Sequence, residues 1–154
     1  MVPQPFNDTY TLASLRVTAA LRVVELNSLT SYFDRAANAV IDATPPYPTD
    51  YTDALVWYPA IAQRVTSQEV RLSSVDSGGL LSWVAGAYYL DEHSHHTWNT
   101  VSNGQTEFDA MQFRQSELDG FGQLTLRLSA RVSASAGVRI GHSNYDYLTA
   151  GAAV

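Results

Sequence analysis

The stretch VSASAGVRIG, from Val132 to Gly141, decides the fold of this chain. Apolar side chains occupy every second position, and serine, glycine or arginine occupies the positions between them. Successive side chains of a β-strand point to opposite faces, whereas a helix would repeat its apolar positions about every 3.6 residues. The stretch is therefore predicted to be a strand with one apolar face.

Working outward, the same alternation runs through Leu118–Leu128, and only Ser129–Arg131 separate the two runs. Two alternating runs joined by so short a link predict a β-hairpin over about residues 117–144. A second alternating pair, joined by the glycine-containing turn Asp76–Gly79, predicts a hairpin over about residues 67–92.

A third hairpin is expected over about residues 10–34, with its turn near Thr18–Ala20. The pattern here is less regular. Residues Val17–Val24 could also form a short helix, because alanine and leucine favour helices and no Gly or Pro marks the turn. The β-rich flanking sequence favours the strand interpretation.

Together these hairpins predict an all-β fold of about six antiparallel strands, with long outer loops at about residues 35–66 and 93–116. Outer-membrane barrels combine short turns on one side with long loops on the other. Aromatic residues at the expected outer ends, such as Tyr32, Tyr89 and Tyr145, would suit an interfacial girdle. The alternative is that aromatic residues simply favour strands in any β protein.

Composition narrows the class of protein. The 154 residues fit one domain, and a hydrophobic content of 45% excludes a disordered chain. A net charge of −6, with nine arginines and no lysine, argues against a nucleic-acid partner. The absence of cysteine excludes disulfides and thiol chemistry. The sequence holds no run of about 18 apolar residues, which excludes a helical membrane span but not a barrel wall of alternating strands.

Three stretches resemble the barrel part of the TonB-dependent outer-membrane receptors. They are LNSLTSYFD at Leu26–Asp34, SQEVRLSS with LSWVAGAYYLDE at Ser67–Glu92, and FGQLTLRLSARVSASAGVRIGHSNYDY at Phe121–Tyr147. The similarity covers about 70 residues in the order expected for that family.

The resemblance implies a segment of a large transmembrane barrel wall, located in the outer membrane of a Gram-negative bacterium. The complete receptor would import a scarce ligand of the siderophore, cobalamin or oligosaccharide class. Its partners would be outer-membrane lipid, the ligand and the inner-membrane TonB complex. We expect residues 1–154 to be a partial barrel domain, because no plug domain, TonB box or signal peptide is recognisable and the chain ends in Gly-Ala-Ala-Val. No cofactor is implied.

The sequence offers one weak sign of an enzyme. DSGG at Asp76–Gly79 is similar to the nucleophile turn of trypsin-like serine proteases. In that family the histidine precedes the serine, whereas all four histidines of this chain follow it. A turn that needs glycine is the preferred interpretation, and we expect the chain not to be an enzyme.

Candidate ligand contacts lie in the two expected outer loops. DEHSHH at Asp91–His96 offers His93, His95 and His96, a weak candidate for a metal or a metal chelate. In an extended chain His93 and His95 share one face and His96 lies on the other, so a site built from all three would need a turn. The alternative is a solvated polar loop.

The other expected loop is rich in proline and aromatic residues, with Tyr47, Tyr51, Trp57 and Tyr58. Rings held by stiff prolines can stack on sugars or catechols. The alternative is that they pack against neighbouring loops.

The rival to a barrel wall is a soluble β-sandwich that binds a carbohydrate or another small ligand. Such a sandwich would bury its apolar faces between two sheets. The small residues of Val132–Gly141 disfavour it, because sandwich cores prefer large aliphatic side chains.

Overall fold

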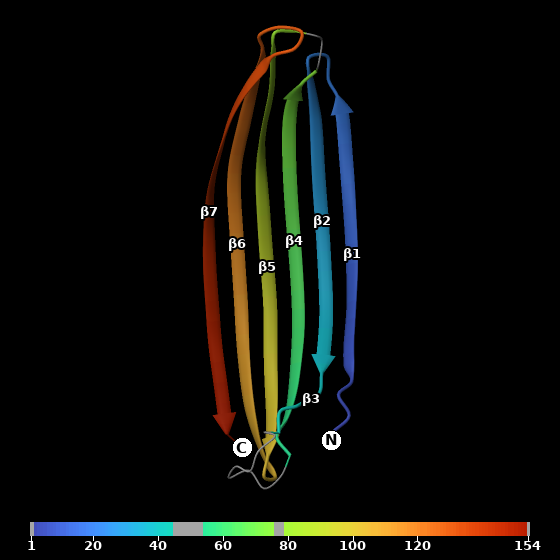
Figure 1. Ribbon diagram of the computed structural model, residues 1–154, viewed down its shortest axis with the longest axis vertical. Helices are drawn as coiled ribbons and strands as arrows, with labels where there is room; N and C mark the ends of the chain where they lie inside the picture. Colours follow the sequence, from blue (N-terminus) through green and yellow to red (C-terminus); the bar gives the residue numbers. More distant parts are fainter. Residues whose placement is uncertain (1, 45–53, 76–78, 154) are drawn as a thin grey trace.

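The computed structural model describes residues 2–44, 54–75 and 79–153 of the chain. They form one open antiparallel sheet, in which each long strand pairs with the next long strand along the chain (Figure 1). The strand order is β1-β2-β4-β5-β6-β7, and the short β3 pairs with β4. The all-β prediction is confirmed, and the described residues form a single sheet rather than the two sheets of a sandwich.

The long strands are unusually extended. Their bounds are β1 Phe6–Ala20, β2 Val24–Ala39, β4 Val56–Ser74, β5 Leu81–Ser102, β6 Gln105–Arg127 and β7 Ser133–Ala153, and β3 is Ile41–Asp42. At about 3.3 Å per residue, the 23 residues of β6 extend over about 75 Å. The first turn lies between Ala20 and Val24, so residues 17–24 are strand and turn, not helix.

The predicted outer loop at residues 93–116 is wrong. These residues continue β5 and β6, which are joined only by Asn103 and Gly104. Both residues have positive φ, 51° and 73°, as a tight hairpin turn of the primed kind requires. Polar side chains line both faces of this segment, so the period-two hydropathy signal disappears although the backbone pairing continues.

The predicted loop at residues 35–66 is also mostly strand. β2 runs on to Ala39 and β4 begins at Val56, so the three predicted hairpins are longer than expected at this end. Of the connection between them, residues 45–53 lie outside the described part of the chain. Figure 1 shows the end of β2, the start of β4 and the turn between β5 and β6 at the same end of the sheet as both termini.

The strand register assigns every side chain to one of two faces. Face A carries Leu81, Trp83, Ala85, Ala87 and Tyr89 of β5, together with their paired neighbours. Face B carries the residues between them, because side chains alternate along a strand and paired residues share a face.

The two faces differ sharply in the upper half of the sheet, as drawn in Figure 1. We define this half as residues 13–20, 24–32, 66–74, 81–90, 118–127 and 133–142. The register places all its charged side chains on face B: Arg16, Glu25, Glu69, Arg71, Asp119, Arg127 and Arg139. Face A carries aliphatic residues that remain exposed, such as Leu124 at 56% and Ile140 at 73%. The described part of the chain leaves this apolar face uncovered.

The aromatic residues that were expected at strand ends lie inside the strands. Tyr32 pairs with Thr66, whose other partner Asp91 lies two residues beyond Tyr89. Tyr32 and Tyr89 therefore mark the lower border of the apolar part of face A, and the strands continue past them, whereas Tyr145 lies on face B.

Close packing within the sheet occurs at Gly86 and not at Gly120. A Cβ atom on Gly86 would lie 2.5 Å from the ring of Phe121, whereas a Cβ on Gly120 would meet nothing within 4 Å. The Phe121 ring covers the glycine across the strand pair, and the Arg71 guanidinium lies over the same ring, 5.7 Å from its centre.

The sheet has two free edges and little interior. Within the described residues β1 and β7 each pair on one side only. The buried residues there are Ala37, Val56, Ser94 and Asp119, which do not make a hydrophobic core. Within the described residues, face A and both edges of the sheet are therefore uncovered.

Candidate ligand-binding face

Below the tyrosine border, face B becomes rich in aromatic side chains. In β5, Ser94, His96 and Trp98 follow one another on this face. The Ser94 hydroxyl and His96 Nε2 lie 2.6 Å apart, and the His96 and Trp98 rings lie 5.9 Å apart. Because Ser94 is buried and fixes the imidazole, His96 and Trp98 form an ordered surface rather than part of a loop.

A second aromatic group lies beside the first, on β6 and β7. Phe113, which pairs with Ser94, has its ring 6.2 Å from that of Tyr145. Gln115 donates a hydrogen bond of 3.2 Å to the Tyr145 hydroxyl. Tyr145 remains 57% exposed, so its ring is available to a ligand. Aromatic faces with a few placed polar groups are typical of small-molecule sites.

Face B also carries an ion pair between its first two strands. Arg35 donates hydrogen bonds to both carboxylate oxygens of Asp8, from Nε to Oδ1 at 2.9 Å and to Oδ2 at 3.2 Å, and from one terminal nitrogen to Oδ2 at 2.8 Å. The hydrogen bond from Arg35 lowers the pKa of the Asp8 carboxyl below its usual value. This bidentate pair joins β1 to β2 in the lower half of the sheet.

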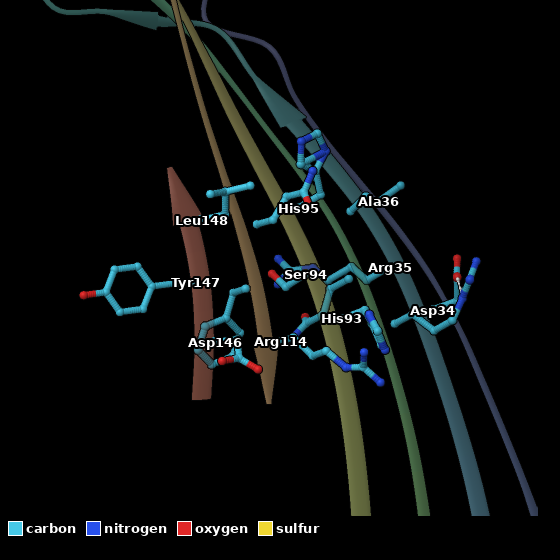
Figure 2. Close-up of a pocket in the computed structure, with 15 residues that line it drawn as sticks. Asp34, Arg35, Ala36, His93, Ser94, His95, Arg114, Asp146, Tyr147 and Leu148 are labelled. Atoms are coloured by element: carbon cyan, nitrogen blue, oxygen red, sulfur yellow. Dashed lines mark hydrogen bonds and ion pairs between the residues drawn. The ribbon is translucent and has the colours of Figure 1, made fainter. Parts of the chain in front are cut away.

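Face A has a hollow of about 670 Å³ in the same lower half (Figure 2). Its charged and imidazole side chains on this face are Asp34, Arg64, His93, His95, Arg114 and Asp146. Figure 2 shows His93 and Arg114 side by side on neighbouring strands, while the ring of Tyr147 extends away from them.

The structure divides the sequence-predicted contacts between the two faces. His93 and His95 lie on face A with Tyr58, whereas His96 and Trp57 lie on face B. Because β5 continues without a turn through all three histidines, they do not converge. No cluster of three metal-ligating side chains occurs within residues 2–44, 54–75 and 79–153. Tyr47 and Tyr51 fall outside the described residues, as does Ser77 of the DSGG turn.

Sequence reasoning missed two aromatic residues of face B, Trp98 and Phe113. The sequence contained a signal for their shared face. His96 and Trp98 are two residues apart, as are Met111 and Phe113, so in a strand the members of each pair lie on the same face. These positions were read as loop, where side-chain parity has no meaning, and so their common face was not recognised.

Comparison with known proteins provides a structural match but no sequence match. No family model matches the sequence, and no curated protein matches it. The crystal structure of the ferric yersiniabactin uptake receptor FyuA from Yersinia pestis superposes on 98% of this chain with a TM-score of 0.82. The chain has the fold of a barrel-wall segment.

The match to FyuA has low sequence identity and covers only part of the FyuA chain. Sequence identity is 14%, so the similarity establishes the fold alone, and this chain covers 23% of the FyuA chain. Seven strands in one unclosed sheet agree with part of a barrel wall. The described residues include no helix that is long and apolar enough to cross a membrane.

Proposed function

We propose that this chain is a segment of the wall of a TonB-dependent outer-membrane receptor, with face A toward lipid and face B toward the lumen. The observation that carries this proposal is the separation of charge in the upper half of the sheet. On β5 the charge-free part of face A runs from Leu81 to Tyr89, close to the about 9–11 residues that a strand needs to cross a bilayer.

The free energy of burial supports this orientation. A charged side chain costs about 2–4 kcal/mol on the lipid side of a barrel near the bilayer centre, whereas the lumen tolerates charge. In the upper half of the sheet, face B carries seven charged side chains and face A carries none. No long strand would therefore place a charge in lipid. A soluble sheet of the same sequence would expose Leu124, Val138 and Ile140 to water.

The open edges support a larger barrel. Unpaired backbone groups at β1 and β7 would each cost several kcal/mol in hydrocarbon, so both strands need neighbours from the rest of a barrel. FyuA, whose structure contains a closely similar sheet within a chain about four times as long, is an uptake receptor for a ferric ligand. Energised uptake of a scarce small ligand is the function that suits this architecture.

Strands β4 to β7, with 19 to 23 residues, are about twice as long as a bilayer requires, so the lower half would extend beyond the outer surface of the membrane. In this arrangement the aromatic part of face B lines the entrance to the lumen. We assign ligand contacts to His96, Trp98, Phe113 and Tyr145, together with Trp57 further along the same face.

Tryptophan fluorescence in vesicles tests the orientation. The measurement uses the receptor that contains this segment, with tryptophans outside the segment replaced by phenylalanine. The segment has three tryptophans, so Trp57→Phe with Trp98→Phe leaves Trp83 on face A of the upper half. Trp57→Phe with Trp83→Phe leaves Trp98 on face B of the lower half. Lipids with brominated acyl chains should quench Trp83 strongly and Trp98 weakly. Equal, weak quenching of both would reject the membrane orientation and favour the soluble sandwich.

Uptake tests the transport role. In cells that express the receptor containing this segment, accumulation of a labelled ferric siderophore, cobalamin or maltooligosaccharide should stop when the proton gradient is collapsed. Trp98→Ala with Phe113→Ala should weaken binding of the accepted ligand by about threefold to tenfold for each ring. Tyr58→Ala, on face A, is the matched control. Uptake that is insensitive to the proton gradient would contradict the proposal.

A further inference from the structure

The charged side chains of the lower half are divided unequally between the two faces of the sheet. Arg64 and Arg114 lie on face A, where each pairs with an aspartate. Within the described residues of this half, face B has Arg35 as its only permanent cation. The carboxylates on the same part of face B are Asp8, Glu92, Glu107, Asp109 and Glu117. The lower half of face B is therefore acidic.

Three of these five carboxylates have partners of their own. Asp8 belongs to the bidentate pair that joins β1 to β2. Gln63 donates a hydrogen bond of 2.7 Å to Glu92 Oε1. Glu117 Oε1 lies 3.6 Å from a terminal nitrogen of Arg139, which belongs to the upper half. The excess negative charge is thus concentrated on the two remaining acids of β6.

Asp109 and Glu107 are these two acids, and they lie two residues apart on one face. Both side chains are exposed, and within the described part of the chain neither has an ion-pair or hydrogen-bond partner. The Asp109 carboxylate lies over its paired residue on β7, Gly151. A Cβ atom on that glycine would be only 2.5 Å from Asp109 Oδ1. The absence of a side chain at Gly151 therefore gives this carboxylate its place on the open face.

Tryptophan rings lie beside the two carboxylates. Trp98 pairs directly with Asp109, so their Cβ atoms are about 5 Å apart on the same face. Glu107 lies on the diagonal from Trp98, at about 7–8 Å. On β5 the next residue of this face, Thr100, pairs with Glu107 on one side and with Trp57 on the other. The register thus combines aromatic surface and uncompensated negative charge at one place.

A cation suits this place better than an anion or a neutral group. The face of an indole ring attracts ammonium groups, and a carboxylate beside it adds a charge-assisted hydrogen bond. A surface lined by one sign of charge also raises the local concentration of ligands of the opposite sign. On the proposed function, this part of face B lines the entrance to the lumen. Resting on that function, we propose that the imported ligand carries a protonated or quaternary amine, which binds at Trp98, Asp109 and Glu107.

Fluorescence quenching of Trp98 by two viologens tests this inference. The receptor that contains this segment, with Trp98 as its single tryptophan, is reconstituted in lipid nanodiscs, which leave both sides open to solutes. Methyl viologen is a dication, whereas its bis(sulfonatopropyl) analogue has the same aromatic core and no net charge. We expect saturable quenching by methyl viologen and about tenfold weaker binding of the analogue, in moderate salt.

Substitution of the two carboxylates should remove this preference. Asp109→Asn and Glu107→Gln are each expected to weaken the binding of methyl viologen by about twofold to fivefold and to leave the analogue unaffected. The matched control is Asp146→Asn, which removes an exposed carboxylate from face A of the lower half and should change neither affinity. Circular dichroism confirms that each variant keeps its β content.

Two competitors at equal ionic strength identify the kind of cation. Choline chloride should displace methyl viologen, because a quaternary ammonium group binds to an aromatic face. Displacement by calcium chloride and not by choline would assign the two carboxylates to an inorganic cation and would overturn the proposal.

The outcomes separate this inference from the proposed function. Equal binding of the two viologens, or a preference for methyl viologen that survives both carboxylate substitutions, would overturn the cation site. The uptake role would stand, because the proton-gradient experiment measures it separately. No quenching of Trp98 by either viologen would show that the ring is closed to water. That result would overturn both the cation site and the position of this part of face B at the entrance.

Discussion

Arg139 on β7 donates a hydrogen bond of 2.6 Å from Nε to Oδ2 of Asp119 on β6, and a terminal nitrogen of the same guanidinium contacts that oxygen as well. The Asp119 side chain is only 5% exposed, whereas that of Arg139 is 60% exposed. The pair lies on face B of the upper half and ties the edge strand β7 to the rest of the sheet.

This asymmetry predicts an order of effects. Arg139→Gln should destabilise the sheet more than Asp119→Asn, because the first leaves a buried carboxylate without its cation and the second leaves an arginine that can reach water. Urea unfolding of the receptor that contains this segment, reconstituted in vesicles and followed by circular dichroism, measures both. Arg131→Gln in the β6–β7 turn is the control. The opposite order would show that Asp119 is solvated in the folded protein.

Charge on face A should be costly. Val138→Arg is expected to lower the free energy of unfolding in phosphatidylcholine vesicles by about 2–4 kcal/mol, because it places a guanidinium in hydrocarbon. Ser135→Arg adds the same charge to face B of the same strand and should cost less than half as much. Equal losses for the two variants would mean that the faces share one environment.

The Gly86 site should not tolerate a larger side chain. Gly86→Val is expected to cost about 1–3 kcal/mol, because the new side chain must displace the Phe121 ring and meets the Val70 carbonyl oxygen. Gly120→Ala, in open space on the other face of the neighbouring strand, is the matched control and should be nearly neutral. Similar urea midpoints for the two variants would contradict the close packing at Gly86.

The Asn103–Gly104 turn should depend on its backbone conformation. Gly104→Ala is expected to cost about 1 kcal/mol, since φ is +73° and L side chains disfavour that region. Amide hydrogen exchange should then accelerate in β5 and β6 near the turn, with the upper half unaffected. Unchanged exchange near residues 100–107 would indicate a loop there instead of a tight hairpin.

The Asp8–Arg35 pair predicts a pH effect confined to β1. Because the hydrogen bond from Arg35 lowers the pKa of folded Asp8 below its unfolded value of about 3.8, the pair stabilises at pH above that value. The stabilisation is lost as the pH falls through the lower folded pKa. The protection factors of β1 amides, which correct exchange for its intrinsic pH dependence, should therefore fall at acidic pH, and Asp8→Asn should remove this dependence while weakening β1 at neutral pH.

The sequence was most informative where the two faces of the sheet differ. In Val132–Gly141 the apolar and polar positions alternate strictly, so strand, hairpin and face all follow from the pattern. Between Tyr89 on β5 and Leu118 on β6, both faces carry polar residues. The alternation of polar and apolar positions therefore no longer indicates a strand in this segment. Residues 93–116 therefore resembled a loop, although the dipeptide Asn103–Gly104 is a recognised signal for a tight hairpin.

The candidate site shows the same limit. The opposed directions of His93 and His96 followed from parity, and the structure agrees with it. Their grouping with Phe113 or Arg114 required the register between β5 and β6, which depends on pairing across the sheet and is not encoded in either strand alone.

The most direct test of the central claim is a cysteine scan along β7, because the chain has no cysteine of its own. Each position from 133 to 142 is replaced in turn in the receptor that contains this segment, and each variant is spin-labelled and reconstituted in vesicles. Oxygen, which concentrates in lipid, should reach labels at Ala134, Ala136, Val138 and Ile140, and a water-soluble nickel complex should reach those at Ser133, Ser135, Gly137 and Arg139. Alternation of the two accessibilities with a period of two is the predicted result. Equal access of the nickel complex to both sets would contradict a barrel wall.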